Sequence, residues 1–363
     1  MIFLTFNDQP SGIYKSQVIE VCEVLDELNS SNILLVAFIP RQNFFDNKRK
    51  IKNWRSKSIV LPILPGLRFW RFSAWIFFWI NTFFSHDKII ARGPIASFIA
   101  IQSRSKKQRV VYDARGLLKA EIEEFNVFQG DLARKAIMME KESVLHADFR
   151  IAVSHALVKY WKQEYNYNSD QHVIIPCWSR ILHSDLIEDS FFDSSSPILV
   201  YSGSTSPWQS FPLLIKFITH ALEQVDCKIL LMCRENPQIQ AIVDAYPGRV
   251  KRIFVPENQV YSYLSLCDYG LLLRNVNDTN RVASPVKFSE YLMCGLRVLI
   301  SPFLGDYSEL VRAKGVGTVV DDVNLIPLLT RIDEEQREKS KVIAYRYLSA
   351  DALMKEYKEI VNF

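Results

Sequence analysis

Short apolar runs alternate with longer amphipathic segments along the whole chain. Short runs rich in β-branched residues are typical of buried strands, and apolar positions spaced three and four apart are typical of helices. The segments that fit the first pattern are Ile2–Phe6, Ile33–Ile39, Ile59–Leu64, Lys88–Arg92, Arg109–Asp113, Phe149–Ser154, His172–Pro176, Ile198–Ser202, Lys228–Met232, Val250–Phe254, Tyr269–Leu273, Arg297–Ser301 and Gly317–Val320. Helical periodicity between them is clearest in Gln17–Leu28, Leu132–Leu145, Phe211–Leu222 and Phe288–Met293. This alternation predicts parallel sheets with crossover helices.

A polar stretch divides the strand segments into two series. Residues 177–197 contain a serine run, end in proline and have no clear period, so they are interpreted as a linker. We therefore predict an α/β chain of two Rossmann-like doubly wound domains, 1–176 and 198–344, that face a cleft. Ligands of such open sheets gather at the carboxyl ends of the strands. A final amphipathic helix is expected from about 334 to 363, and its end, from about 345, is expected to pack back on the first domain.

Composition narrows the class of protein. The 363 residues are 48% hydrophobic and 23% charged, which excludes disordered, collagen-like and coiled-coil chains. The opening residues, MIFLTF followed by NDQPSG, do not have the pattern of a secretory signal. The cysteines are scattered without metal spacing and are expected to be buried free thiols, so we expect a cytoplasmic location. The cysteines are Cys22, Cys177, Cys227, Cys233, Cys267 and Cys294.

The charge is unevenly distributed. Residues 1–180 hold 25 lysine and arginine residues against 17 acidic ones, a net charge of +8, whereas the remainder holds 19 against 23, a net charge of −4. An anionic partner for the first half is therefore expected, and a membrane surface fits better than nucleic acid, because no basic helix carries interleaved stacking aromatics.

One segment of the first half is unusually aromatic. Nine of residues 69–84 are phenylalanine or tryptophan, but the uncharged run between Arg71 and His86 is too short to cross a bilayer. The segment predicts either a half-buried helix of the domain or an interfacial helix edged by Arg68 and Arg71. Residues 41–57, just before it, carry seven basic residues and one acidic residue. Residues 41–84 are accordingly a candidate for peripheral membrane docking, with a solvated loop as the alternative for the basic run.

The most informative chemistry lies in residues 269–306. Ser284 and Pro285 resemble a cap and a first helical residue, followed by Val286. Lys287 then stands in the first turn, where a cation opposes the helix dipole unless an external anion is present. A phosphate on the helix amides would reverse that sign, so Lys287 is a candidate diphosphate ligand. Glu290, one turn later on the same face, could accept both hydroxyls of a ribose. The alternative is a solvated Lys–Glu pair.

The motif S-P-V-K-F-S-E-Y-L-M-C-G-L-R-V-L-I resembles the donor-binding segment of family 4 glycosyltransferases with the GT-B fold, especially those that build bacterial surface polysaccharides. Further matching motifs occur in chain order and cover nearly the whole sequence. They are V-V-Y-D-A-R-G at 110–116, A-D-F-R-I-A-V-S at 147–154, V-I-I-P at 173–176, L-V-Y-S-G-S at 199–204 and C-D-Y-G-L-L-L-R at 267–274. The resemblance implies a sugar nucleotide, of UDP or GDP type, held by the second domain and an acceptor held by the first. It also implies transfer with retention and without a metal cofactor.

The resemblance suggests roles for further residues at strand ends. Gly203, Ser204 and Thr205 would offer amides and hydroxyls to the diphosphate, and Phe254, Val255 and Pro256 end a strand where a nucleobase would stack. In the first domain, Asp113 would hold a sugar hydroxyl or the acceptor. The acceptor side would further include Arg115 and Glu121, while Gly12, in the loop Asn7–Gly12, would lie under the diphosphate. A structural Asp–Arg pair and an ordinary turn with a helix cap are the respective alternatives.

Two departures from the family pattern affect the leaving group. The earlier of two glutamates in the family is Val282 here, and the usual arginine and lysine after the first strand of the second domain are Ser204 and Gln209. Positive charge must then come from other residues, with Lys287 first and Arg274 second. The remaining candidates are Arg234 and Arg281.

Together these observations predict a retaining glycosyltransferase on the inner face of the cytoplasmic membrane. It would move a sugar from a nucleoside-diphosphate sugar to a lipid-linked (polyprenyl-diphosphate) saccharide in the synthesis of O-antigen, capsule or lipopolysaccharide. The alternatives are a sugar-nucleotide epimerase of the same fold and a non-catalytic scaffold derived from a glycosyltransferase.

Overall fold

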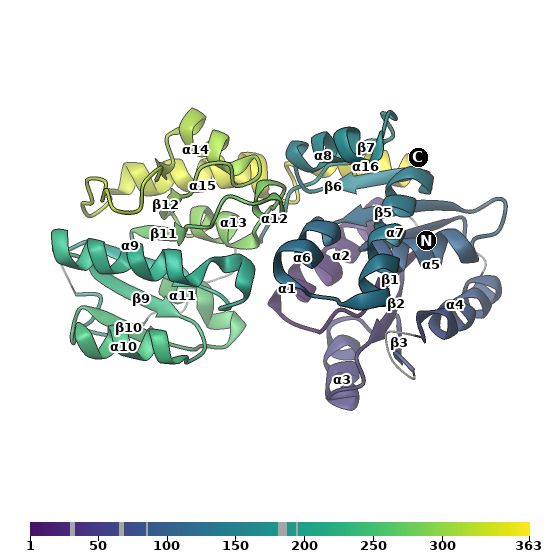
Figure 1. The fold of residues 1–363 in the computed structure, drawn as a ribbon, viewed down its shortest axis with the longest axis horizontal. Helices are drawn as coiled ribbons and strands as arrows, with labels where there is room; N and C mark the ends of the chain where they lie inside the picture. Colours follow the sequence, from purple (N-terminus) through teal and green to yellow (C-terminus); the bar gives the residue numbers. More distant parts are fainter. Residues whose placement is uncertain (30–32, 65–68, 85, 181–186, 194) are drawn as a thin grey trace. The chain divides into compact units, whose positions relative to one another are not determined.

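The computed structural model describes residues 1–29, 33–64, 69–84, 86–180, 187–193 and 195–363. The chain divides into two compact units, drawn in Figure 1. Unit 1 comprises Met1–Pro176 and Leu353–Phe363, and unit 2 comprises Cys177–Ala352. Each unit is one parallel sheet with helices on its faces, as the alternating pattern predicts.

Unit 1 contains a seven-stranded sheet in the order β3-β2-β1-β4-β5-β6-β7. Its strands are β1 (Ile2–Phe6), β2 (Leu34–Ile39), β3 (Ser58–Pro62), β4 (Lys88–Arg92), β5 (Arg109–Ala114), β6 (Phe149–Ala152) and β7 (His172–Ile174). Its helices are α1 (Gly12–Tyr14), the π-helical turn η1 (Lys15–Ile19), α2 (Glu20–Leu28), α3 (Phe44–Trp54), α4 (Trp70–Phe84), α5 (Pro94–Ser103), α6 (Leu118–Phe125), α7 (Gly130–His146), α8 (His155–Tyr165) and α16 (Met354–Asn362).

Unit 2 contains a six-stranded sheet in the order β10-β9-β8-β11-β12-β13. Its strands are β8 (Ile198–Ser202), β9 (Lys228–Met232), β10 (Val250–Ile253), β11 (Tyr269–Leu272), β12 (Arg297–Ile300) and β13 (Gly317–Val319). Its helices are η3 (Pro207–Gln209), α9 (Phe211–Gln224), α10 (Pro237–Ala245), η4 (Glu257–Gln259), α11 (Val260–Leu264), α12 (Asp278–Arg281), α13 (Val286–Met293), α14 (Tyr307–Lys314) and α15 (Glu334–Leu348).

The strands of unit 2 are buried on both faces, so they show continuous apolar runs rather than alternation. In β8, Ile198 and Val200 pack with Phe288 of α13, whereas Leu199 and Tyr201 pack with α9 on the opposite face. The two apolar layers place α13 and α9 on opposite faces of the sheet. All pairings in both sheets are parallel. The predicted α/β class with two doubly wound sheets is confirmed.

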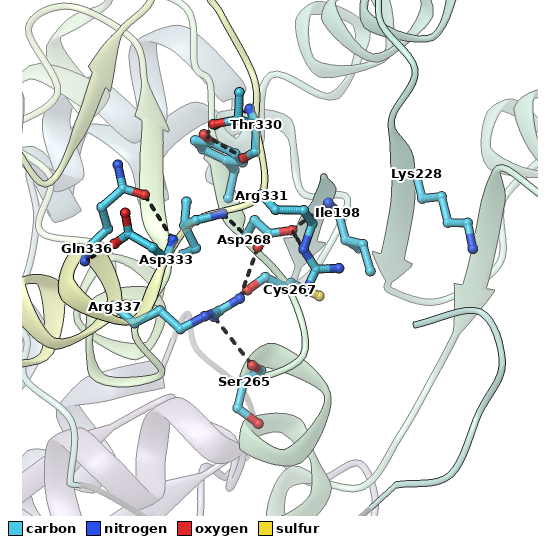
Figure 2. A network of polar contacts seen from close by, with 12 residues as sticks. Ile198, Lys228, Ser265, Cys267, Asp268, Thr330, Arg331, Asp333, Gln336 and Arg337 are labelled. Carbon is cyan, nitrogen blue, oxygen red and sulfur yellow. Dashed lines mark hydrogen bonds and ion pairs between the residues drawn. The ribbon is translucent and has the colours of Figure 1, made fainter. Parts of the chain in front are cut away.

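A buried carboxylate joins the start of α15 to the amino edge of the unit 2 sheet (Figure 2). Asp268, fully buried, accepts hydrogen bonds from the backbone amides of Ile198 at 2.8 Å and Ile332 at 3.3 Å. It also pairs with Arg337 at 2.9 Å and Arg331 at 3.2 Å. Burial raises the pKa of Asp268 against the opposing effect of these partners. We interpret the network as structural, since both carboxylate oxygens of Asp268 have partners within the unit.

The helix expected at the end of the sequence differs in the structure. The helix predicted from about 334 to 363 is two helices, α15 and α16, and the boundary between the units falls between Ala352 and Leu353. Ser349 breaks the helix, because its hydroxyl donates to the carbonyl of Tyr345 and accepts from the amide of Ala352. Only α16 belongs to unit 1, where Lys88 Nζ donates to the carbonyls of Ile360 and Val361 at 2.6 and 2.8 Å.

The predicted linker is described only in part, since residues 181–186 and 194 lie outside the described residues. Its first residues are buried in unit 2: the Ser179 hydroxyl lies 2.6 Å from that of Ser289, and Trp178 is fully buried. All six cysteines are free and buried, as predicted.

Candidate functional site

The loops after the unit 2 strands lie at one edge of the sheet, because all its strands are parallel. Most of the predicted donor-site residues are found there. Gly203, Ser204 and Thr205 follow β8, Arg234 follows β9, Phe254 and Val255 follow β10, and Arg274 follows β11. This edge is where an α/β sheet would be expected to hold a ligand.

Lys287 and Arg274 meet on the side chain of Gln209. The Gln209 Oε1 atom accepts a hydrogen bond from Lys287 Nζ at 2.8 Å and another from Arg274 Nη2 at 3.0 Å. Gln209 and Arg274 are 8% and 6% exposed. We call Lys287, Arg274 and Gln209 the cation cluster. It places two positive groups on one neutral amide oxygen.

Arg274 is held rigidly within the cluster. Its backbone amide donates to the Ser301 hydroxyl at 2.8 Å, and its Nη1 donates to Asn280 Oδ1 at 3.3 Å. Asn280 is in turn fixed by Asn275 and Asn277 through side-chain hydrogen bonds. Within the described residues, the Arg274 Nε atom is buried with no hydrogen-bond partner. The guanidinium therefore keeps an unused donor.

Lys287 lies directly against the backbone of Gly203. A Cβ atom on Gly203 would lie 2.6 Å from Lys287 Cε and 2.8 Å from Nζ, and the φ angle of Gly203 is +140°, so only glycine fits. The ammonium group also stands 4.1 Å from the ring centroid of Tyr201, a cation–π contact. These contacts bring the carboxyl end of β8 and the first turn of α13 together.

The electrostatics of the cluster favour an anion. Burial, followed by the nearby charge of Arg274, holds the pKa of Lys287 well below its usual value. Burial also lowers the pKa of Arg274, to about 10. An anionic ligand would relieve both effects, since it would compensate two cations that share an uncharged amide oxygen as acceptor.

Helix α13 begins one residue later than the capping interpretation predicts. Its first residue is Val286, and Pro285 takes the cap position without a side-chain hydrogen bond. Ser284 does not cap the helix, because its hydroxyl accepts from the amide of Cys177 and bonds with the Tyr307 hydroxyl. Lys287 remains in the first turn, which has no acidic residue. The cation therefore opposes the helix dipole, as the sequence predicts.

The position of α13 depends on a close approach at Gly270 of β11. The ring of Tyr291 lies so near that a Cβ atom on Gly270 would fall 2.2 Å from it. The Tyr291 hydroxyl accepts a hydrogen bond from the amide of Ser202 at 3.0 Å. This anchor fixes the helix that carries Lys287 and Glu290, the latter half-buried and one turn further along.

Two more predicted residues pair at the same edge. The ring of Phe254 is 64% exposed, and the Arg234 guanidinium stands 5.5 Å from its centroid. An exposed aromatic ring beside a guanidinium offers a flat surface for a nucleobase. Arg281 is placed differently: it is exposed and pairs with Asp278 on α12 at 3.6 Å. Val282 is buried, so no carboxylate occupies the position of the family's first glutamate.

Unit 1 has its own polar group at the carboxyl edge. Asp113, fully buried in β5, pairs with Arg115 Nε at 2.7 Å and lies 3.9 Å from Arg92 Nη1. Arg92 also lies 3.6 Å from Asp8, in the loop after β1. The structural Asp–Arg pair that the sequence offers as an alternative is thus present, and an acceptor role for Asp113 and Arg115 stays a prediction.

The remaining unit 1 candidates lie in the loops at that edge. Gly12 opens α1, with the Ser11 hydroxyl as its cap. A Cβ atom on Gly116 would lie 3.2 Å from Glu121 Oε1, so the Glu121 carboxylate rests against the β5–α6 loop. Burial, with a smaller effect from Glu124, raises the pKa of Glu121 to about 7. A carboxyl group that titrates near neutrality suits proton exchange with a hydroxyl.

Sequence reasoning missed three contributors. The sequence indicates Gln209 only as a departure from the family pattern, and it assigns no role to Tyr201 or Arg92. A charged residue at the carboxyl end of a strand with an apolar centre, as Arg92 ends β4, is a signal that identifies one of them. The role of Gln209 depends on tertiary contacts that no local pattern carries. Among the described residues no group of three or more metal-ligating side chains is present.

Comparison with known proteins identifies the class of fold. No protein-family model and no curated protein matches the sequence. Among solved structures, the chain is similar to a sucrose-phosphate synthase from Thermosynechococcus elongatus, with 14% identity over 99% of this chain and 98% of that one and a TM-score of 0.73. Anabaena HepE in complex with UDP is similar at 14% identity over 99% of each chain, with a TM-score of 0.68.

The UDP-GlcNAc 2-epimerase from Neisseria meningitidis, bound to UDP-GlcNAc, is also similar, at 13% identity over 99% of this chain and 98% of that one and a TM-score of 0.57. The chain therefore has the fold of GT-B glycosyltransferase structures, a fold that it shares with sugar-nucleotide epimerases.

Proposed function

We propose that the chain is a glycosyltransferase that uses a nucleoside-diphosphate sugar, bound at the carboxyl edge of the unit 2 sheet. The cation cluster is the observation that carries the proposal. It supplies a buried guanidinium with an unused donor and a half-buried ammonium group, beside a glycine loop and the first turn of a helix. Such groups stabilise the charge that develops on a departing diphosphate.

A UDP sugar is the donor that we favour over a GDP sugar. UDP or UDP-GlcNAc is named in the structures of HepE and of the Neisseria epimerase, which share this fold. In this chain the exposed Phe254 ring with Arg234 would stack the base, Glu290 would accept the ribose hydroxyls, and Lys287 and Arg274 would hold the diphosphate.

Retention of configuration is part of the proposal. The bond between the anomeric carbon and the diphosphate oxygen breaks, the acceptor hydroxyl oxygen forms the new bond on the same face, and its proton leaves with the diphosphate. The cation cluster would contribute only by stabilising the leaving diphosphate. We further propose a lipid-linked saccharide as the acceptor, in the synthesis of a surface polysaccharide at the inner face of the cytoplasmic membrane. The basic first half of the sequence supports an anionic acceptor.

The first test is nucleotide binding by calorimetry, with UDP, GDP, ADP, CMP and dTDP, each with and without magnesium. We expect UDP to bind, and Lys287→Met to weaken it at least tenfold. Lys314→Met is the matched control, because Lys314 also makes a cation–π contact, at 5.2 Å from the Tyr347 centroid, but lies on α14. If no nucleotide binds, the donor site is refuted and a scaffold becomes the better hypothesis.

An epimerase is the second candidate, because solved epimerases share the fold. Incubation with a UDP sugar in the absence of any acceptor separates the two reactions. An epimerase converts the donor sugar without a second substrate, whereas a transferase requires an acceptor for turnover. A new epimeric sugar nucleotide in that reaction would refute the transferase proposal.

A further inference from the structure

Helix α4 presents a row of aromatic side chains to solvent. Phe72, Trp75, Trp79 and Phe83 are spaced three and four residues apart, with Phe78 beside them, and so lie along one side of the helix. Trp75, Trp79 and Phe83 are 58%, 56% and 83% exposed. We call these five residues the aromatic face of α4. Exposed apolar area of this extent on one element is unusual in a folded chain and indicates a binding surface.

The opposite side of α4 fixes this orientation. Phe77 is fully buried in the unit 1 core beside Phe98 of α5, and Figure 1 places α4 on the outer side of α5. Asn81, also buried, donates to the Ser103 carbonyl at 3.2 Å and to Gln108 Oε1 at 2.8 Å. The helix is therefore docked through the side that carries Ser73, Phe77 and Asn81, and the aromatic face cannot turn inward without breaking these contacts.

The surroundings of the aromatic face are positively charged. Between Asp46 and Asp113 the sequence holds fourteen lysine and arginine residues and a single acid, Asp87, and two of the basic residues, Arg55 and Lys88, are buried. Exposed Arg71 stands in the first turn of α4. Lys106 and Lys107 are exposed in the loop that Asn81 contacts, near the last turn. Apolar aromatic rings between basic side chains are complementary to an anionic lipid surface.

We propose that the aromatic face of α4 rests on an anionic lipid bilayer, with the helix axis in the plane of the interface. The helix has 15 residues, or about 22 Å of length, and no helix among the described residues is long and apolar enough to cross a membrane. A second copy of this chain fits less well, since the same basic surroundings would meet each other. Tryptophan and phenylalanine are the residues expected at the boundary between headgroups and acyl chains.

This proposal revises the sequence-based one. The sequence predicts either a half-buried helix or an interfacial helix that docks jointly with residues 41–57. In the structure α4 is both, because one side is buried and the other exposed. The basic run includes α3, Phe44–Trp54, and stays a prediction as a second docking element. Residues 65–68, including Arg68, lie outside the described residues.

Vesicle co-sedimentation tests the proposal with the full chain and without any donor, so its outcome is independent of glycosyl transfer. Vesicles with 30% phosphatidylglycerol in phosphatidylcholine are compared with phosphatidylcholine alone. We expect binding to the anionic vesicles and a loss of at least tenfold for Trp75→Ser/Trp79→Ser/Phe83→Ser. The matched control is Leu325→Ser/Leu328→Ser in unit 2, which removes two side chains that are 70% and 89% exposed.

A charge variant keeps the test decisive should the triple variant fold poorly. Lys106→Glu/Lys107→Glu leaves the aromatic face intact and should weaken binding several-fold while reducing its dependence on salt. The proposal would be overturned if the wild-type protein did not bind anionic vesicles. It would also be overturned if the charge variant and the aromatic variant bound as well as the wild type. A wild-type dimer that becomes monomeric in the triple variant would overturn it too, because the face would then join two copies.

Discussion

Gln209 is the residue at which the cations of the cluster, Lys287 and Arg274, meet. Its amide oxygen accepts from Lys287 and Arg274 without adding charge, so the pair keeps its net positive charge. A carboxylate of the same shape would neutralise the pair instead. If the cluster is the proposed diphosphate site, the charge of this side chain affects how strongly the site attracts its ligand.

We predict that Gln209→Glu raises the melting temperature of the unligated protein and weakens UDP binding at least tenfold, equivalent to about 1.4 kcal/mol. The carboxylate forms charge-assisted hydrogen bonds with both cations and competes with the diphosphate. Scanning calorimetry and titration calorimetry measure the two effects. Gln259→Glu, at an exposed position of η4, serves as the control and should change neither quantity. Unchanged UDP affinity in Gln209→Glu would show that the cluster is not the diphosphate site.

The depressed pKa of Lys287 gives the site a pH dependence of known sign. The unfolded chain keeps the lysine proton up to its ordinary value of 10.5, whereas the folded protein releases it at lower pH. In that window the unfolded state binds more protons, so the contribution of Lys287 makes the unligated protein more stable as pH rises.

UDP affinity should move in the opposite direction over the same window, because only the charged lysine attracts the diphosphate. Titrations from pH 5.5 to 10 should show weaker binding as pH rises, and the same series with Lys287→Met isolates the contribution of the lysine from the titration of UDP itself. Arg274, with a pKa of about 10, adds to the decline only at the alkaline end. Equal slopes for the wild type and the variant would contradict this assignment.

At the scale of elements, the hydrophobic pattern predicted every strand of both sheets to within about two residues. Buried parallel strands are the easiest elements to detect, because they are short apolar runs separated by helices. The predicted helix boundaries are wrong where hydrogen bonds of polar side chains determine where a helix begins or ends. The Ser349 hydroxyl ends α15 by bonding to the backbone of Tyr345 and Ala352. The Ser284 hydroxyl bonds with Cys177 and Tyr307 and does not cap α13.

The candidate site also divides into residues that local sequence patterns indicate and contacts that depend on the fold. A lysine in the first turn of a helix contradicts a local rule, so Lys287 could be found from sequence, and Arg274 could be found at a strand end. The bridging by Gln209 and the contact of Lys287 with Gly203 join segments about eighty residues apart, and only the folded sheet brings them together.

At the scale of the whole molecule, unit 1 is completed by the last eleven residues of the sequence. The ring of Phe363 packs on Phe149 at 4.7 Å between centroids, and the Arg109 guanidinium stands 4.8 Å from the same ring. Lys88 donates to two carbonyls at the end of α16, where the helix dipole favours a cation.

We predict that Phe363→Ala destabilises unit 1 by about 1–3 kcal/mol, less than the 3–5 kcal/mol typical of a fully buried phenylalanine, because the ring is half-buried. Urea unfolding followed by tryptophan fluorescence reports mainly on unit 1, which holds five of the seven tryptophans. Phe303→Ala, at an exposed position of unit 2, should have little effect. Equal stability of Phe363→Ala and wild type would show that α16 contributes little to unit 1.

The return of the chain to unit 1 also fixes an order of events during synthesis. A ribosome makes all of residues 177–352 before it makes α16, so unit 2 can fold while unit 1 still lacks a helix. Until then Lys88 has no carbonyl acceptors from α16, and Phe149 lacks the ring that covers it. Residues 1–176, which are made before unit 2, therefore belong to a unit that is completed only after residues 177–352 have been made.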